Sequence, residues 1–388
     1  MKTATRCVHL TANDDPFGAI CPPIYQTATF RQPSALDFGD YDYTRSGNPT
    51  RTIAERQLAA LEGGRFACAF SSGMAAIAAL LHLLSSDDEI IAGDDLYGGT
   101  TRLLEQTLSR QGIVVHYVDT TDLVAVERVL SSRTRLILVE TPSNPLLRVS
   151  DLRRLAELAH EAGCLLAVDN SMLSPCLQQP LKLGADVVIH SATKFLSGHS
   201  DVTAGALVTN NEFLQRQISF QQNAEGAGLS PFESWLLIRG LKTLSLRVER
   251  QNESAQKIAE YLVRHESVSR VYYPGLADHV DADIQRKQAN GNGAVISFTT
   301  GDPEFSRRVV EATRLFTIAV SFGSVGSVIS LPCRMSHASI PASLKERLAP
   351  PADLIRISVG IEDVDDLIAD LDQAFTVATR IESAELFV

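Results

Sequence analysis

The chain has 388 residues and a mass of 42.1 kDa, more than one hydrophobic core of ordinary size requires, so two domains are expected. Hydrophobic residues make up 45% of the sequence and charged residues 21%, a balance that is typical of globular proteins and excludes a disordered or fibrous chain. The formal net charge of −11 opposes binding to polyanions, so neither nucleic acid nor an acidic membrane surface is expected as a partner.

The sequence offers no sign of export or of membrane insertion. Residues 1–6 lead into no apolar stretch, and apolar runs such as 75–84 are too short to cross a bilayer. Six cysteines are scattered along the chain without a C-x-x-C pair, which indicates free thiols in a reducing compartment. We therefore expect a cytoplasmic protein without a metal site.

Strands and helices are expected to alternate from residue 66 to residue 189. The expected strands are short and almost wholly apolar: 66–70, 89–92, 114–118, 136–139, 164–168 and 186–189. The expected helices between them have apolar residues at helical spacing: 74–84, 101–110, 123–130 and 151–162. This alternation predicts an α/β fold with a large, mostly parallel sheet that is covered on both faces.

A different pattern follows residue 201 and predicts a smaller α+β domain. Residues 230–264 show apolar positions three and four apart, which predicts one long helix. Further strands are expected at 268–273, 294–299 and 354–359, and further helices at 303–315 and 363–376. The first fifty residues are rich in proline and glycine and fit neither domain. The expected division is therefore an N-terminal arm (1–47) lying against a neighbouring subunit, a large domain (48–242) and a C-terminal domain (243–388).

One of the seven lysines, Lys194, lies in an unusual setting. It follows an expected apolar strand and is surrounded by small and hydroxyl-bearing residues, among them Ser191 and Thr193. Ligands of open α/β sheets bind at such strand ends, and two hydroxyls beside an amine could hold a phosphate. From this segment alone, a solvated loop lysine and a cofactor-binding lysine are equally good interpretations.

Asp169 ends another expected apolar strand, 25 residues before Lys194. A buried carboxylate at that place needs a cationic partner, and a protonated pyridine nitrogen is one. Capping of the following turn would be the simpler role for an isolated aspartate. Together with Lys194, however, Asp169 predicts a site for pyridoxal phosphate (PLP).

Three more loops at strand ends fit the same ligand, although each is a weak signal alone. The turn that contains Gly73 and Met74 opens a helix, whose N-terminal N–H groups could bind the phosphate. Tyr97 could stack on a pyridine ring, although a tyrosine more often serves packing. Asn144 could form a hydrogen bond with the ring hydroxyl.

The sequence resembles the Cys/Met-metabolism PLP enzymes in many separate motifs that occur in the family's order. These motifs are segments 41–50, 72–76, 95–99, 140–145, 168–170, 190–194, 198–201 and 356–362. The resemblance extends over almost the whole chain and implies fold type I of the PLP-dependent transferases, which is aspartate-aminotransferase-like. Within the family the chain is most similar to one branch of the cystathionine β-lyases, on segments 15–19, 169–175, 223–228 and 319–325.

The resemblance implies a role for each candidate residue around the cofactor. Lys194 would bind PLP as a Schiff base and shuttle protons, and Asp169 would pair with the pyridinium nitrogen. Tyr97 would stack on the ring and could act with Lys194 as a proton donor. The groups implied at the phosphate are Gly73, Met74, Ser191 and Thr193.

The resemblance also implies how the substrate and a second subunit contribute. Arg356 would bind the substrate α-carboxylate through two hydrogen bonds, with Ser321 and Asn144 helping to position it. Without the family pattern, Arg356 would be interpreted as a surface residue of a strand. Tyr43 and Arg45 would reach the phosphate and substrate of the neighbouring subunit, so a homo-oligomer, namely a tetramer built from dimers with shared active sites, is expected.

The implied reaction is α,β-elimination of L-cystathionine to homocysteine, pyruvate and ammonia, a step of methionine biosynthesis. Cystathionine γ-lyases and γ-synthases usually have a glutamate where this chain has Val320, and methionine γ-lyases typically have a cysteine where it has Gly99. Both differences favour the β-lyase, although the γ-lyase and the γ-synthase remain alternatives. A binding or regulatory protein with this fold would be expected to have lost Lys194, Asp169 or Arg356, and all three are present.

Overall fold

The structure is a computed structural model that describes residues 1–9, 15–335 and 349–385; part of the expected C-terminal domain and Lys345 lie outside the described residues. Its main feature is a seven-stranded sheet in the order β1-β7-β6-β5-β4-β2-β3. These strands are β1 (Phe66–Phe70), β2 (Glu89–Gly93), β3 (Val114–Val118), β4 (Thr134–Glu140), β5 (Leu165–Asp169), β6 (Val187–Ser191) and β7 (Gly205–Thr209). Of the seven strands, β7 alone runs opposite to the other six, so the expected mostly parallel sheet is confirmed.

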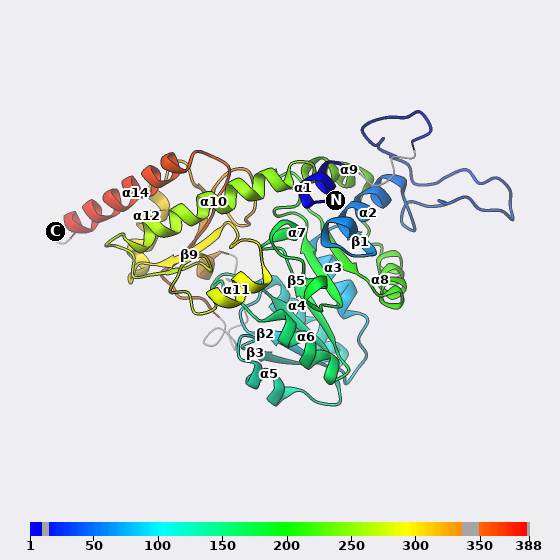
Figure 1. The fold of residues 1–388 in the computed structure, drawn as a ribbon, viewed down its shortest axis with the longest axis horizontal. Helices are drawn as coiled ribbons and strands as arrows, with labels where there is room; N and C mark the ends of the chain where they lie inside the picture. The colour runs from blue at the N-terminus through cyan, green and yellow to red at the C-terminus, as the bar shows by residue number, and fades with distance from the viewer. Residues whose placement is uncertain (10–14, 336–348, 386–388) are drawn as a thin grey trace.

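Helices cover both faces of this sheet (Figure 1). The elements of this half of the chain are α2 (Pro49–Glu62), α3 (Gly73–Leu81), α4 (Gly98–Gln106), α5 (Leu123–Val129), α6 (Leu152–Glu161), α7 (Ser174–Leu177), α8 (Glu212–Ala224) and α9 (Pro231–Leu241), with short 3-10 turns η1 (Leu108–Gln111) and η2 (Pro180–Leu183). In β4, Leu136 and Leu138 pack with α3, α4 and α8, whereas Ile137 and Val139 pack with α5 and α6. Alternate residues of one strand thus enter two separate cores, which explains why the strands are apolar throughout.

The second half of the chain builds a five-stranded sheet in the order β10-β11-β12-β9-β8, of which only the pair β10 and β11 is parallel. Its strands are β8 (Arg270–Tyr272), β9 (Val295–Thr299), β10 (Thr317–Ile318), β11 (Val328–Ser330) and β12 (Leu354–Ser358). Its helices are α10 (Leu244–Val263), α11 (Ala282–Gln288), α12 (Pro303–Ala312) and α14 (Val364–Glu385), with a 3-10 turn η3 (Pro332–Arg334). The smaller unit that the sequence predicts is confirmed, with β10, β11 and α11 as unpredicted additions.

The single helix expected over 230–264 is wrong, because α9 and α10 are separated at residues 242–243. Gly240 packs so tightly against the loop after Lys194 that a Cβ atom there would lie 2.3 Å from the Ser197 carbonyl oxygen. Arg247 donates from Nη2 to the Gly240 oxygen (2.9 Å) and from Nη1 to the Phe195 oxygen (2.8 Å). Helix α9 therefore ends where Arg247 binds both the Gly240 carbonyl oxygen of the helix and the Phe195 carbonyl oxygen of the Lys194 loop.

The N-terminal arm is only partly irregular. It begins with the short helix α1 (Thr3–Val8), which packs on α2 and α10. Helix α2, which the sequence analysis missed, has strong signals at both ends: Asn48 caps it, Pro49 is its first residue and Gly63 (φ +73°) ends it. Residues 15–47 form a long loop that protrudes from the rest of the chain (Figure 1), and it is attached where Tyr25 N donates to Thr50 Oγ1 (3.0 Å) and Trp235 Nε1 donates to the Pro22 carbonyl oxygen (3.1 Å). In the described ranges, no helix is both long and apolar enough to span a bilayer.

Candidate active site

A cavity of about 450 Å³ lies where the carboxyl ends of the parallel strands meet a loop and a strand of the smaller sheet. Its residues come from the turn before α3, the turn before α4, the ends of β4, β5 and β6, the loop before β11, and β12. They are Ser72, Gly73, Met74, Ile77, Tyr97, Arg102, Glu140, Asn144, Asp169, Ser171, Ser191, Thr193, Lys194, Thr203, Val320, Ser321, Phe322, Met335 and Arg356. The parallel sheet brings these segments together because all its parallel strands end on the same edge.

Ten of the twelve residues predicted for the site line this cavity, and Tyr43 and Arg45 do not. Those two line a separate depression beside α9, where the Arg45 side chain donates to the Asn223 carbonyl oxygen (2.9 Å). Tyr43 is 42% exposed. Within one chain, therefore, the arm does not reach the Lys194 cavity.

Lys194 points into the cavity and contacts the smaller sheet's loop. Its Nζ atom donates to Ser321 Oγ (2.6 Å) and lies 4.8 Å from the centroid of the Phe322 ring. Burial, together with the positive charge of Arg356, lowers the pKa of Lys194 to about 8. A substantial fraction of the amine is therefore neutral near pH 8, and the neutral form is the one that attacks a carbonyl carbon.

Arg356 is nearly fully buried and is held in place by two groups of the cavity. Its Nη1 atom donates to Asn144 Oδ1 (2.8 Å) and its Nη2 atom donates to the Ser321 carbonyl oxygen (3.0 Å). Burial lowers its pKa to about 10, so it stays charged at neutral pH. Ser321 has φ +84°, a left-handed conformation that costs a non-glycine residue energy and that directs its hydroxyl and carbonyl groups to Lys194 and Arg356.

Two carboxyl groups end neighbouring strands on the cavity floor. Asp169 and Glu140 are paired in register between β5 and β4. Burial raises the pKa of both side chains, and for Glu140 the nearby Asp169 raises it further. Asp169 Oδ1 accepts from Ser171 N (2.9 Å), and Glu140 Oε2 accepts from Tyr97 N (3.0 Å). Glu140 was not among the predicted site residues, although its place at the end of an apolar strand is the same signal that identified Asp169.

The turn before α3 has the shape that a phosphate requires. A Cβ atom on Gly73 would lie 2.9 Å from Ser191 Cβ, so only glycine lets the helix N-terminus approach this strand end. The hydroxyl of Thr193 accepts from Ala204 N (2.9 Å) and Ser72 Oγ accepts from Ala75 N (3.0 Å), which fixes both walls. The cavity has three features that fit PLP. They are the buried amine of Lys194, the buried carboxyl group of Asp169 and the N–H groups of the turn before α3.

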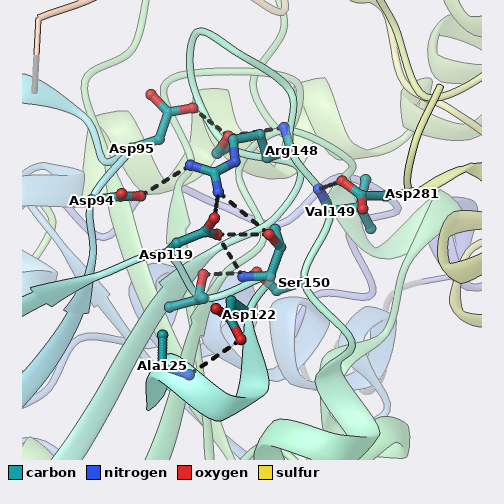
Figure 2. A network of polar contacts seen from close by, with 12 residues as sticks. Asp94, Asp95, Asp119, Asp122, Ala125, Arg148, Val149, Ser150 and Asp281 are labelled. Atoms are coloured by element: carbon teal, nitrogen blue, oxygen red, sulfur yellow. Dashed lines mark hydrogen bonds and ion pairs between the residues drawn. The ribbon is translucent and has the colours of Figure 1, made fainter. Parts of the chain in front are cut away.

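Arg148 links the two loops that carry Tyr97 and Asn144 (Figure 2). Its Nη1 atom donates to Asp94 Oδ1 (3.2 Å) and its Nη2 atom binds Asp119. Asp95, two residues before Tyr97, accepts hydrogen bonds from Ser143 Oγ and from Leu146 N (3.2 Å).

A link to the smaller unit continues this network, because Asp281 Oδ2 accepts from Val149 N (3.0 Å). The network therefore holds the loop after β2 and the loop after β4 in one arrangement. It lies behind the cavity, and neither Arg148 nor its partners was predicted from the sequence.

A cysteine or other side chain at position 99 would alter the cavity wall. A Cβ atom on Gly99 would lie 2.4 Å from Tyr97 Cε1 and 3.1 Å from Met74 Sδ. The Tyr97 ring thus occupies the space that a side chain at residue 99 would need. Within the described residues, no group of three or more His, Cys, Asp or Glu side chains could hold a metal ion.

Comparisons with known proteins agree with this site. The model of the Cys/Met metabolism PLP-dependent enzyme family matches residues 4–376. The chain is 54% identical to the chloroplastic cystathionine beta-lyase of Arabidopsis thaliana (96% of this chain, 81% of that protein) and 46% identical to the cystathionine gamma-lyase of Bacillus subtilis (96% and 99%). It superposes on the crystal structure of cystathionine gamma-lyase from Lactobacillus plantarum with a TM-score of 0.95 at 43% identity, covering 98% and 100% of the two chains.

These matches confirm two expectations, namely fold type I of the PLP-dependent transferases and PLP as the cofactor. The chain belongs to the Cys/Met metabolism family of PLP-dependent enzymes.

Proposed function

We propose that the protein is a cystathionine β-lyase, which converts L-cystathionine and water to homocysteine, pyruvate and ammonia. The observation that carries this proposal is Val320, which is 57% exposed and lines the cavity beside Ser321. An apolar side chain there provides no acid–base group for a second proton transfer at Cβ, which γ-elimination needs and β-elimination does not. The relative named cystathionine beta-lyase at 54% identity supports the same choice.

In this proposal Lys194 has two tasks. Bound PLP supplies an electron sink that stabilises negative charge on the substrate Cα atom. Lys194 would hold the cofactor covalently, and its free amine would remove the Cα proton of the substrate. Its lowered pKa suits both tasks, because the amine must be neutral to act as nucleophile and as base. Lys194 or Tyr97 then gives a proton to the departing thiol.

The remaining cavity residues hold the cofactor. Asp169 pairs with the protonated ring nitrogen, which relieves the cost of burying that carboxylate. Tyr97 stacks on the ring and Asn144 binds the ring hydroxyl. The phosphate is bound by Gly73, Met74, Ser191 and Thr193, and by Tyr43 and Arg45 of a second copy.

Arg356 and Ser321 bind the substrate α-carboxylate. The Arg356 guanidinium is buried, positively charged and oriented by Asn144, so an anion at the cavity mouth meets a fixed pair of donors. Asn144 and the second copy's arm, through its Tyr43, complete this substrate site.

We further propose a cytoplasmic homotetramer built from dimers. The six cysteines of the chain are all free thiols, which fits a reducing compartment. Phe17 and Ile20 are each 94% exposed in the arm, and large apolar side chains of that kind favour contact with a second copy. We retain residues 1–47 as the arm, 48–242 as the large domain and 243–388 as the C-terminal domain, because the two sheets lie on either side of residue 242.

Product analysis with L-cystathionine tests this function. The parent enzyme is expected to release homocysteine and pyruvate, measured by thiol chromatography and a lactate dehydrogenase assay, and to act more slowly on L-cystine or djenkolate. V320E should raise the share of cysteine and 2-oxobutyrate several-fold, while the control V124E, on the exposed face of α5, should leave the product ratio unchanged. Mainly cysteine and 2-oxobutyrate from the parent would establish the γ-lyase instead. Faster synthesis of cystathionine from cysteine and an acylated homoserine would establish the γ-synthase.

A further inference from the structure

A buried pair of charged residues lies behind the cavity floor. Glu62 ends α2 and His190 is the fourth residue of β6; both side chains are 1% exposed, and Glu62 Oε1 lies 2.6 Å from His190 Nε2. In β6, Ile189 packs in the core beneath α3, whereas Val188 packs in the core that includes α2. His190 therefore shares the Val188 face and lies across the sheet from the cofactor cavity.

The pair is joined to the residue that follows Asp169. Asn170 Nδ2 donates to Glu62 Oε1 (2.8 Å) and to the Gln178 carbonyl oxygen (2.9 Å), and Asn170 N donates to the Ile189 carbonyl oxygen (3.0 Å). Gln178 Nε2 continues the chain to the Thr141 carbonyl oxygen (3.0 Å). These contacts connect the ends of β4, β5 and β6, and they fix the backbone on which Asp169 stands.

The pair is costly if its only role is structural. Glu62 Oε2 and His190 Nδ1 are buried, and among the described residues neither has a hydrogen-bond partner. Apolar side chains of similar volume usually stabilise a core as well as a buried ion pair does, or better. A buried pair with two unsatisfied atoms at this position therefore indicates a role in the neighbouring site.

The electrostatic effect of the pair on Asp169 is such a role. Burial raises the pKa of Asp169, whereas the positive charges of His190 and Lys194 oppose that rise. Glu140 also faces Asp169, and burial raises the pKa of Glu140 well above its ordinary value.

We propose that Glu62 and His190 are positioning residues for the cofactor: in contact with each other and with Asn170 behind the sheet, they hold Asp169 as the partner of the PLP ring nitrogen, so that this nitrogen stays protonated. Neither residue touches the cofactor, and both act through Asp169. The inference rests on the role proposed above for Asp169 as partner of the ring nitrogen, and it does not depend on which bond of the substrate is cleaved.

Nitrogen-15 NMR of the cofactor tests the proposal directly. Apoenzyme is reconstituted with PLP that carries 15N in the ring, and the chemical shift of that nitrogen reports whether it is protonated. The variants are E62Q and H190Q, which keep side-chain size, and the double variant E62Q/H190Q, which replaces the pair by two neutral amides. The control is E89Q, which removes a buried carboxylate with a histidine neighbour (His116, 3.3 Å) at the opposite edge of the sheet.

The parent and E89Q should show a protonated ring nitrogen from pH 7 to pH 9. In each of the three pair variants, a large fraction of the signal should move to the unprotonated position. Because Asp169 is then a weaker partner of the ring nitrogen, the Kd for PLP should rise about tenfold. Circular dichroism and thermal melting identify the variants that fold, and one folded variant is enough. A protonated nitrogen in the folded pair variants would overturn the inference alone, whereas an unprotonated nitrogen in the parent would overturn the role of Asp169 and the inference with it.

Discussion

The pKa of Lys194 is lowered by its surroundings. The chain has seven lysines, and Lys194 combines burial with an adjacent guanidinium, that of Arg356. Both effects disfavour the ammonium form, so the amine loses its proton at a lower pH than an exposed lysine does. The guanidinium for which we propose binding of the substrate carboxylate thus also lowers the pKa of the Lys194 amine.

The pH dependence of cofactor capture should report this shift. Because the pKa of Lys194 is lowered to about 8, the neutral amine increases about tenfold per pH unit up to pH 8 and then levels off. The rate at which apoenzyme develops the visible absorbance of lysine-bound PLP, followed by stopped flow between pH 7 and pH 10, should rise and level off in the same way. K194A should develop no such band. A rate that keeps rising to pH 10 would show that Lys194 has the pKa of an ordinary lysine.

The loops after β2 and β4 behave as one element because Arg148 joins them. Their motifs were read from the sequence as separate weak signals for Tyr97 and Asn144, and in the structure one guanidinium and one carboxylate, that of Asp95, connect them. Hydrogen bonds to charged groups contribute about 1.5–3 kcal/mol each when buried, and less here because Arg148 is 30% exposed.

R148A should therefore weaken the site more than the fold. Without the Arg148 side chain, the Tyr97 and Asn144 loops are no longer joined and should move independently. The Kd for PLP should therefore rise and kcat/KM should fall, each by about tenfold. The melting temperature should fall by only a few degrees. The control R135A removes an exposed arginine that pairs with Asp88 (3.5 Å) at the opposite end of β4, and it should change neither constant. Equal effects of R148A and R135A would contradict the role of Arg148 in joining the two loops.

At the scale of the whole molecule, the arm is the feature that a single chain leaves without a partner. Phe17, Ile20 and Leu36 are at least 89% exposed, and the arm's Tyr43 and Arg45 lie outside the Lys194 cavity of their own chain. A segment with so much exposed apolar surface needs another surface to cover it. The proposed dimer provides that surface and completes the site at the same time.

Mixed dimers test whether the site is shared. R45A and K194A subunits are each expected to be inactive as homodimers, since each site lacks one required group. After subunit exchange, one of the two sites in a mixed dimer would have both groups intact, so activity should recover to about a quarter of the parent value in a random mixture. Mass spectrometry of the exchanged dimers provides the control. Verified exchange without recovery would place the action of Arg45 within its own chain or outside the reaction.

The alternation of strands and helices and eight of the residues around the cavity could be predicted from the chain's own pattern, whereas Ser321 and Arg356 were predicted only from the resemblance to the family. The pattern was sufficient for those eight because a parallel sheet places all its parallel strand ends on one edge, so that apolar runs followed by Lys194, Asp169 or Asn144 already indicate neighbours in space. The apolar spacing over 230–264 predicted one helix, and this prediction was wrong. The helix is interrupted at residues 242–243, because Gly240 and Arg247 contact the Lys194 loop.

Which distant groups act on these residues depends on how the chain packs in three dimensions. Arg356 comes to Lys194 from a strand 162 residues later, Arg148 joins two loops, and Glu62 reaches His190 from a helix that the sequence analysis did not identify. No periodicity or local motif encodes such pairings, because they depend on how sheets and helices pack. Burial, which shifts the pKa values of Lys194 and Asp169, is likewise a property of the packed chain and not of the residue.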